Sequence, residues 1–329
     1  MASRDLVGPG LVLLFCASQA FRDVYFGNVF QGVDFFAVIL LAFVASTVIF
    51  TAIPLIRDPA AFARLRGQIG DVVAANIFTA MAWSCYFFAL THLEPSVVNT
   101  LHSGMAPLTV VALAALGIRL AKAEAVGWAE YFGYCGIAAS MIALAWVVLS
   151  GHSGFATGDD SMALLGLAAL MVSGAAITVS LLYCKRLQDR GASADVVTAV
   201  RFLLLIVIAA GMIWHKGELL GIGSAGEAVS LTMLATVLIV LPLYALQVGI
   251  GLTAPLTAQV LRALGPVFVF ALQQVDGRLT YSAPTLICIL AYSAAAILSN
   301  LAHARAATRA TKISARRWPW QPQAAARRS

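Results

Sequence analysis

Charged residues are scarce in this sequence, and their scarcity argues against a soluble fold. Only 11% of the 329 residues are Asp, Glu, Lys or Arg, whereas 61% are hydrophobic and the mean hydropathy is +0.89. A soluble domain carries roughly 25% charged residues, because water must solvate its surface. This chain cannot cover itself in that way, so we expect it to lie within a lipid bilayer.

The sequence also lacks the patterns of the commonest chemical sites. Its five cysteines all fall in apolar runs without CxxC or metal-ligand spacing, and we interpret them as small apolar side chains rather than a disulfide or zinc framework. The Gly221-Ile222-Gly223 segment lacks the strand and helix that flank a dinucleotide-binding turn. Because no phosphate loop, catalytic triad or metal cluster is recognisable, we expect no enzyme activity, no cofactor and no bound metal.

Long apolar runs are what the sequence has in abundance. A helix needs about 20 apolar residues to cross a membrane, and the absence of period-two alternation favours helices over strands. The first run follows Met1-Ala2-Ser3-Arg4-Asp5 without an Ala-x-Ala cleavage site, so we interpret it as a membrane helix and not as a removable signal peptide. Ten spans are predicted, at about residues 6–27, 35–55, 72–93, 95–118, 125–149, 161–184, 196–214, 229–252, 255–275 and 281–303.

The basic residues fall mainly on one side of these predicted spans. The opposite side carries only Lys216 and Arg278, together with several acidic residues. By the positive-inside rule both termini are cytoplasmic, and we expect a multi-pass protein of the inner (plasma) membrane. This distribution explains the net charge of +6 without a nucleic-acid partner. The residues on the cytoplasmic side are Arg4, Arg57, Arg64, Arg66, Arg119, Lys122, Lys185, Arg186, Arg190, Arg305, Arg309, Lys312, Arg316, Arg317, Arg327 and Arg328.

One stretch of the sequence occurs twice. The segment that begins Pro-Ser-Val-Val-Asn-Thr-Leu-His at Pro95 is matched by Pro-Leu-Thr-Ala-Gln-Val-Leu-Arg at Pro255. Two similar helices in corresponding places are typical of a transporter built from repeats. The matched pairs are Pro95 with Pro255, Asn99 with Gln259, His102 with Arg262, Pro107 with Pro266, and Arg119 with Arg278.

The spans divide into two halves. Residues 1–150 and 151–303 each hold five predicted spans, and a basic, disordered cytoplasmic tail is expected at 304–329. Because five is odd, the second half must enter the membrane from the opposite face. The predicted fold class is therefore an all-α membrane protein with ten transmembrane helices in two inverted five-helix repeats. Such repeats place the substrate near the membrane midplane, between the halves.

This organisation resembles the drug/metabolite transporter superfamily, and more narrowly the EamA-type exporters, which carry the EamA domain twice. The resemblance implies secondary transport of small metabolites or toxic compounds, most often outward. The chain departs from the family pattern at Cys16-Ala17, where the family usually has Trp-Gly, and at Ile118, where it has glutamate. The matching residues are Tyr86-Phe87-Phe88-Ala89-Leu90, Pro107-Leu108, Gly117-Ile118-Arg119-Leu120, Gly127, Gly133, Gly136, Arg201, Tyr244-Ala245-Leu246, Pro266-Val267 and Gly277-Arg278-Leu279.

Polar residues within the spans are the first candidates for function, because a charge at the centre of a membrane helix costs roughly 2.5–3.5 kcal/mol. His102 and Arg262 lie at matched depths on helices that enter from opposite faces, and so bracket the midplane with roughly 10 Å between their levels. Arg262 could bind a carboxylate through two parallel hydrogen bonds, and His102 could hydrogen-bond or exchange a proton. The alternative is that both bind neighbouring helices.

The remaining substrate-site candidates have equally plain structural alternatives. Asn99 and Gln259 are expected to donate into the cavity or, alternatively, between helices. Pro107 and Pro266 free backbone carbonyls and could gate the cavity or simply kink their helices. The resemblance implies that the third and eighth spans line the substrate path, although aromatic residues there can also face lipid or the core. The candidates on those spans are Trp83, Tyr86, Tyr244 and Gln247.

Arg22 and Asp23 are adjacent near the end of the first span. Since adjacent helical residues point about 100° apart, we predict that they do not pair within that helix, and we interpret them as charges at the outer interface. Asp23 is nevertheless the only carboxylate inside a span away from its cytoplasmic end. Asp23 and His102 are therefore the candidate proton carriers if transport is proton-coupled.

These features predict a secondary-active transporter that works by alternating access, as a monomer or a homodimer in membrane lipid. We expect it to export a small polar, carboxylate-bearing metabolite such as an amino acid or its derivative, with protons as the candidate coupling ion. An exporter of hydrophobic cationic drugs would need intramembrane carboxylates, in which this chain is poor. A membrane enzyme or a non-transporting scaffold are the alternatives from other classes.

Overall fold

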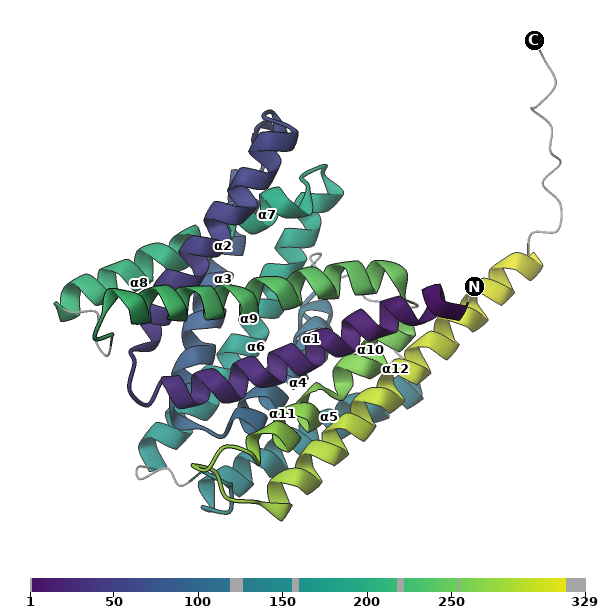
Figure 1. The fold of residues 1–329 in the computed structure, drawn as a ribbon. Coiled ribbons are helices and arrows are strands. Elements are labelled where there is room, and N and C mark those ends of the chain that lie inside the picture. Colours follow the sequence, from purple (N-terminus) through teal and green to yellow (C-terminus); the bar gives the residue numbers. More distant parts are fainter. Residues whose placement is uncertain (1, 119–126, 156–159, 218–221, 254, 318–329) are drawn as a thin grey trace, which may run out of the picture.

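The computed structural model describes residues 2–118, 127–155, 160–217, 222–253 and 255–317. Every regular element within these residues is a helix (Figure 1). The elements are α1 (Ala2–Val29), α2 (Phe35–Arg57), the short 3₁₀ helix η1 (Ala61–Leu65), α3 (Ile69–His92), α4 (Pro95–Ala115), α5 (Trp128–Leu149), α6 (Asp160–Asp189), α7 (Ala194–Val200), α8 (Leu203–Lys216), α9 (Ala225–Leu252), α10 (Pro255–Ala263), α11 (Gly265–Gln273) and α12 (Ala283–Arg317).

The chain is an all-helical, membrane-embedded protein. Among the described residues, eight helical segments are long and apolar enough to cross a membrane. The predicted spans in α1 and α9 are not among the eight: α1 carries Arg22 and Asp23, and the described apolar helix within α9 covers Ala225–Ile239. The eight are Phe35–Arg57, Ile69–His92, Pro95–Ala115, Trp128–Leu149, Asp160–Asp189, Ala194–Lys216, Leu256–Gln273 and Ala283–Ala306.

Local sequence explains where these helices begin and end. Asp34 caps α2 by accepting a hydrogen bond from the Phe36 N–H, and Ser193 caps α7 in the same way. Pro95 opens α4, where its missing N–H costs nothing. Gly217 ends α8 with φ of 79°, a left-handed conformation that glycine adopts without strain. The last helix, α12, continues to Arg317. The expectation of a disordered tail from residue 304 is therefore wrong for residues 304–317, which are helical.

Two of the predicted spans are broken helices. In the ninth predicted span, α10 ends at Ala263 and α11 begins at Gly265. Pro266 follows this break and lacks the N–H that would continue the hydrogen-bond ladder. Its sequence counterpart Pro107 lies inside the unbroken α4. The repeated prolines therefore have different structural outcomes.

The second break, between α7 and α8, is bridged by a side chain. Asn76 of α3 donates from Nδ2 to the carbonyl of Val200 at 2.8 Å, and its Oδ1 accepts from the Leu204 N–H at 3.0 Å. These two backbone groups would bond directly in a continuous helix. The Asn76 amide is thus inserted into one turn and satisfies both groups, which holds α3 against the break.

The helices pack closely in pairs. α3 packs along α6, α1 along α9, and α5 along α12; Figure 1 shows α1 (purple) beside α9 (green). Small residues permit the closest approaches. A Cβ added to Gly133 would lie 2.5 Å from Ser299 Cβ, and one on Gly174 would lie 2.6 Å from the His102 carbonyl oxygen.

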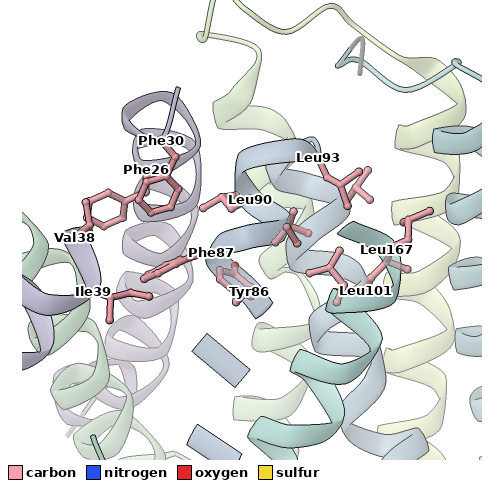
Figure 2. Packing of buried hydrophobic residues seen from close by; sticks show 14 of the residues in the cluster. Phe26, Phe30, Val38, Ile39, Tyr86, Phe87, Leu90, Leu93, Leu101 and Leu167 are labelled. Atoms are coloured by element: carbon pink, nitrogen blue, oxygen red, sulfur yellow. The ribbon is translucent and has the colours of Figure 1, made fainter. Parts of the chain in front are cut away.

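An aromatic core joins α1 to α2 and α3 (Figure 2). Phe26 and Phe30 stack with ring centroids 5.7 Å apart, and Phe30 meets the edge of Phe87 at 5.2 Å. Figure 2 shows Val38 and Ile39 of α2 beside these rings. This core fixes α1 against α3 at the level at which the polar residues of both helices face each other.

The bridge across the α7–α8 break gives a stability prediction. Asn76→Ala leaves the Val200 carbonyl and the Leu204 N–H without their partner, and we expect a loss of about 1–3 kcal/mol of unfolding free energy. Thermal unfolding of the detergent-purified protein measures it. The exposed Asn28→Ala is the control. Equal melting temperatures for the two variants would contradict the bridging role.

Candidate functional site

A buried ion pair lies on α1. The Nε and Nη2 groups of Arg22 donate to Oδ1 of Asp23 at 2.9 and 2.7 Å. Asp23 is 0% exposed and Arg22 is 8% exposed. The prediction that these neighbours do not pair is wrong. Both side chains point to packed helices, Arg22 towards α3 and Asp23 towards α4, and the long arginine side chain reaches back to the carboxylate.

Side chains of α3 and α4 complete the surroundings of this pair. Asn99 donates from Nδ2 to Oδ2 of Asp23 at 2.9 Å. The guanidinium carbon of Arg22 lies 5.4 Å from the ring centroid of Trp83 and 5.5 Å from that of Tyr86. Each oxygen of Asp23 therefore has a donor, while the arginine rests on two aromatic rings.

His102 joins the same group of residues from α4. Its ring meets the edge of Tyr86 with centroids 4.7 Å apart, and its Nδ1 lies 3.0 Å from Oγ of Ser173 on α6. Ser173 donates its hydroxyl proton to the Ala82 carbonyl at 2.7 Å. The tautomer with a proton on Nδ1 therefore satisfies both contacts. We call Arg22, Asp23, Trp83, Tyr86, Asn99 and His102 the Asp23 cluster.

Two donors of the Asp23 cluster are unused within the described residues. The Trp83 indole Nε1 is buried and has no hydrogen-bond acceptor there. Arg22 donates through Nε and Nη2 to Asp23 and Tyr86, and its Nη1 makes no hydrogen bond to the described residues. Free hydrogen-bond donors beside a buried cation favour the binding of a ligand that supplies an acceptor, such as a carboxylate or carbonyl oxygen.

The structure places Arg262 and Gln259 apart from His102. Both are exposed on α10, and Arg262 interacts electrostatically with Cys16 of α1 and Tyr292 of α12. No hydrogen bond among the described residues joins Arg262 to His102. α4 instead approaches the other half of the broken helix one turn after Arg262, at the start of α11. A Cβ on Gly265 would lie 3.7 Å from Oδ1 of Asn99. The start of α11 thus reaches the Asp23 cluster.

The remaining sequence candidates have mixed outcomes. Trp83, Tyr86, Asn99 and His102 lie together in the Asp23 cluster. The side chains of Tyr244 and Gln247 lie outside the described part of the structure.

Sequence reasoning missed a second buried polar group. Glu94, between α3 and α4, is 1% exposed. It accepts hydrogen bonds from Ser96 Oγ at 2.9 Å, from the Gly154 N–H at 2.8 Å and from Gln273 Nε2 of α11. Gln273 also accepts from the Ser96 N–H at 3.1 Å. We call this end of the bundle the Glu94 end. Its only sequence signal is an acid directly before the repeated proline.

An ion pair lies at the same end of the bundle. Arg278 donates to the Gly27 carbonyl at 2.7 Å and to Oδ2 of Asp276 at 2.6 Å. Burial raises the pKa of the Asp276 carboxyl, but the side-chain and backbone hydrogen bonds from Arg278, with its charge, outweigh burial, so that the pKa lies below its usual value. Hydrogen bonds thus close the Glu94 end. Gln273 of α11 bonds to Glu94 and to the Ser96 N–H of α4, Glu94 bonds to Gly154 in the loop after α5, and Arg278, after α11, bonds to Gly27 of α1.

No protein-family model matches this chain, and no curated protein does. Nine chains of solved structures match it. One of them, described only as "Crystal structure of protein", aligns with a TM-score of 0.58 and 19% identity over 91% of this chain and 98% of its own. At that identity the likeness shows the fold alone. Nearly the whole helical arrangement therefore recurs in a protein of known structure.

The closure at the Glu94 end can be tested by removing one amide. Gln273→Leu leaves Glu94 and the Ser96 N–H each short of one partner, and we expect a loss of about 1–3 kcal/mol of stability. Gln274→Leu is the matched control, because Gln274 is exposed and bonds only to Phe270 of its own helix. Thermal unfolding in detergent compares them. Equal melting temperatures would show that the network does not stabilise this end.

The Asp276–Arg278 pair predicts an acid-sensitive contribution to stability. Because the pKa of folded Asp276 is depressed, the pair stabilises the fold above the unfolded value of about 3.9 and is lost as pH falls through the lower folded value. We expect the Asp276→Asn protein to be less stable than the unaltered protein at neutral pH. The difference in melting temperature should shrink below about pH 4. A difference that stays constant down to about pH 2 would contradict this.

Proposed function

We propose that this chain is a secondary-active transporter that moves a small carboxylate-bearing metabolite by alternating access. The observation that carries the proposal is the Asp23 cluster, a charged and aromatic group buried between three helices of a membrane-embedded bundle. Ionisable groups at such positions are costly and mark solute or proton pathways. A cation that lies on two aromatic rings and has unused donors beside it suits a planar carboxylate.

The helix pairing supports an organisation in two inverted halves, α1–α5 and α6–α12, with ten membrane crossings. In that division α1 corresponds to α6, α3 to α9, and α5 to α12. A two-fold axis between the halves requires that α3 pack along α6 as α9 packs along α1, and that α5 meet its own counterpart α12. These are the extensive helix pairs of the bundle. The arrangement is the one expected of an EamA-type exporter of the drug/metabolite transporter superfamily.

The Glu94 end supports alternating access in a second way. Under the positive-inside rule it faces away from the cytoplasm, and its bonds close that side of the bundle. Arg262 and Gln259, exposed on the half of the broken helix nearer the opposite end, are assigned to the path from the cytoplasm to the Asp23 cluster. The substrate then leaves by opening the Glu94 end, in the plasma membrane, in the direction of export.

The alternative of a hydrophobic-cation exporter is less well supported. Such a substrate needs a carboxylate that is free to bind it, whereas both oxygens of Asp23 already have donors. The hypotheses of a membrane enzyme and of a scaffold subunit do not explain why the Trp83 indole N–H and Nη1 of Arg22 are left without acceptors among the described residues. The assay below distinguishes these classes, since neither an enzyme nor a scaffold moves solute across a sealed vesicle.

Transport by the purified chain in proteoliposomes tests the proposal. The probes are L-alanine, L-threonine, L-phenylalanine, N-acetyl-L-alanine and gluconate, each compared with its primary amide, which lacks the carboxylate. We expect uptake of at least one acid and not of its amide. Arg22→Gln should lower that uptake at least tenfold, because the variant lacks the cation that binds the carboxylate.

Arg57→Gln, at the exposed end of α2, is the matched control. Size-exclusion chromatography establishes that both variants remain folded. Absence of uptake for every probe would exclude transport of this substrate class, and uptake unaffected by Arg22→Gln would remove Arg22 from the site.

A further inference from the structure

Asp23 occupies the place on Arg22 that a substrate carboxylate needs. Arginine binds a carboxylate best through two parallel N–H groups on one edge of the guanidinium. The Nε–Nη2 edge of Arg22 is already taken by Oδ1 of Asp23. A substrate that binds this edge must therefore displace Asp23.

Among the described residues no second cation contacts Asp23; Arg278, which reaches the Gly27 carbonyl one turn further along α1, is paired with Asp276. α3 contributes Tyr86, and α4 contributes the neutral Asn99 together with His102, which bonds to Ser173. Of the other helices that pack on α1, the described part of α11 places no charged group there, and Arg262 of α10 interacts with Cys16, almost two turns before Asp23. The side chain of Tyr244 on α9 lies outside the described part.

Displacement therefore leaves a carboxylate without its countercharge in a fully buried position. An unpaired charge in a protein interior is strongly unfavourable, and the group neutralises instead. Arginine keeps its proton under these conditions. The proton must be taken up by the carboxylate, and it comes from water on the open side.

We propose that substrate and proton share this site by exchange: the substrate carboxylate replaces Asp23 on Arg22, and Asp23 takes up one proton. The proposal rests on the transport function proposed above. Two hydrogen bonds from Arg22 to Asp23 break, two form to the substrate, and Asp23 gains one O–H group. On release the proton leaves and the buried pair forms again. One proton therefore crosses with each substrate molecule, in the same direction.

The same proteoliposomes test the exchange when they contain a pH-sensitive dye. With the acid probes above, we expect uptake by the unaltered protein to acidify the vesicle interior, with about one proton for each substrate molecule. Uptake without acidification overturns the proposal and leaves transport intact. No uptake of any probe overturns the proposed transport function itself, so the two failures are distinguishable.

Asp23→Asn separates binding from coupling, because asparagine has the same shape and cannot take up a proton. We expect this variant to exchange labelled for unlabelled substrate while a pH gradient drives at least tenfold less accumulation. Glu227→Gln, on the exposed first turn of α9, is the control and should accumulate substrate normally.

Two outcomes in this series overturn the proposal. The first is accumulation by Asp23→Asn that still follows the pH gradient. The second is loss of acidification in His102→Gln but not in Asp23→Asn, which would assign the proton to His102. If Asp23→Asn does not fold, the proposal is judged on the number of protons that the unaltered protein takes up with each substrate molecule, and uptake without acidification overturns it.

Discussion

The hydrogen bonds to Asp23 are the constraint on which the rest of the structure depends. A carboxylate that is fully buried in a membrane protein must have a donor for each oxygen, because no water there replaces a missing one. Arg22 supplies one donor set and Asn99 the other, so that α1 and α4 are held together at this level. Trp83 and Tyr86 cover the guanidinium from α3, and the aromatic core around Phe87 fixes α3 against α1. The start of α11 then packs against Asn99 from the other half of the chain.

Much of the fold follows from the sequence, because membrane helices are specified locally. Apolar run length located α2 and α3 within a few residues, and the predicted span 229–252 ends at the same residue as α9. The breaks were harder to predict. The one beside Pro266 has a sequence signal, yet the same proline signal at Pro107 leaves α4 intact. The break between α7 and α8 has none of its own, since it is stabilised by Asn76 from a distant helix.

The candidate site was predictable in its composition and not in its connections. Searching the spans for polar residues found Asn99 and His102, because such residues are rare inside a membrane and need partners. The family resemblance pointed to Trp83 and Tyr86 on the third span. The Arg22–Asp23 pair was missed, because the angle between adjacent helical positions says nothing of the reach of an arginine side chain. Glu94 and Gln273 were missed for another reason: they lie at span ends, where a polar residue is ordinary until tertiary packing buries it.

The adjacency of Arg22 and Asp23 has a consequence for the assembly of the protein. Partners that are neighbours in the chain can meet within one helix, before α3 and α4 have been synthesised. α1 can therefore enter the lipid with its two charges already neutralised by each other. Asn99 and the aromatic rings of α3, which are synthesised later, then contact a pair that can already have formed within α1.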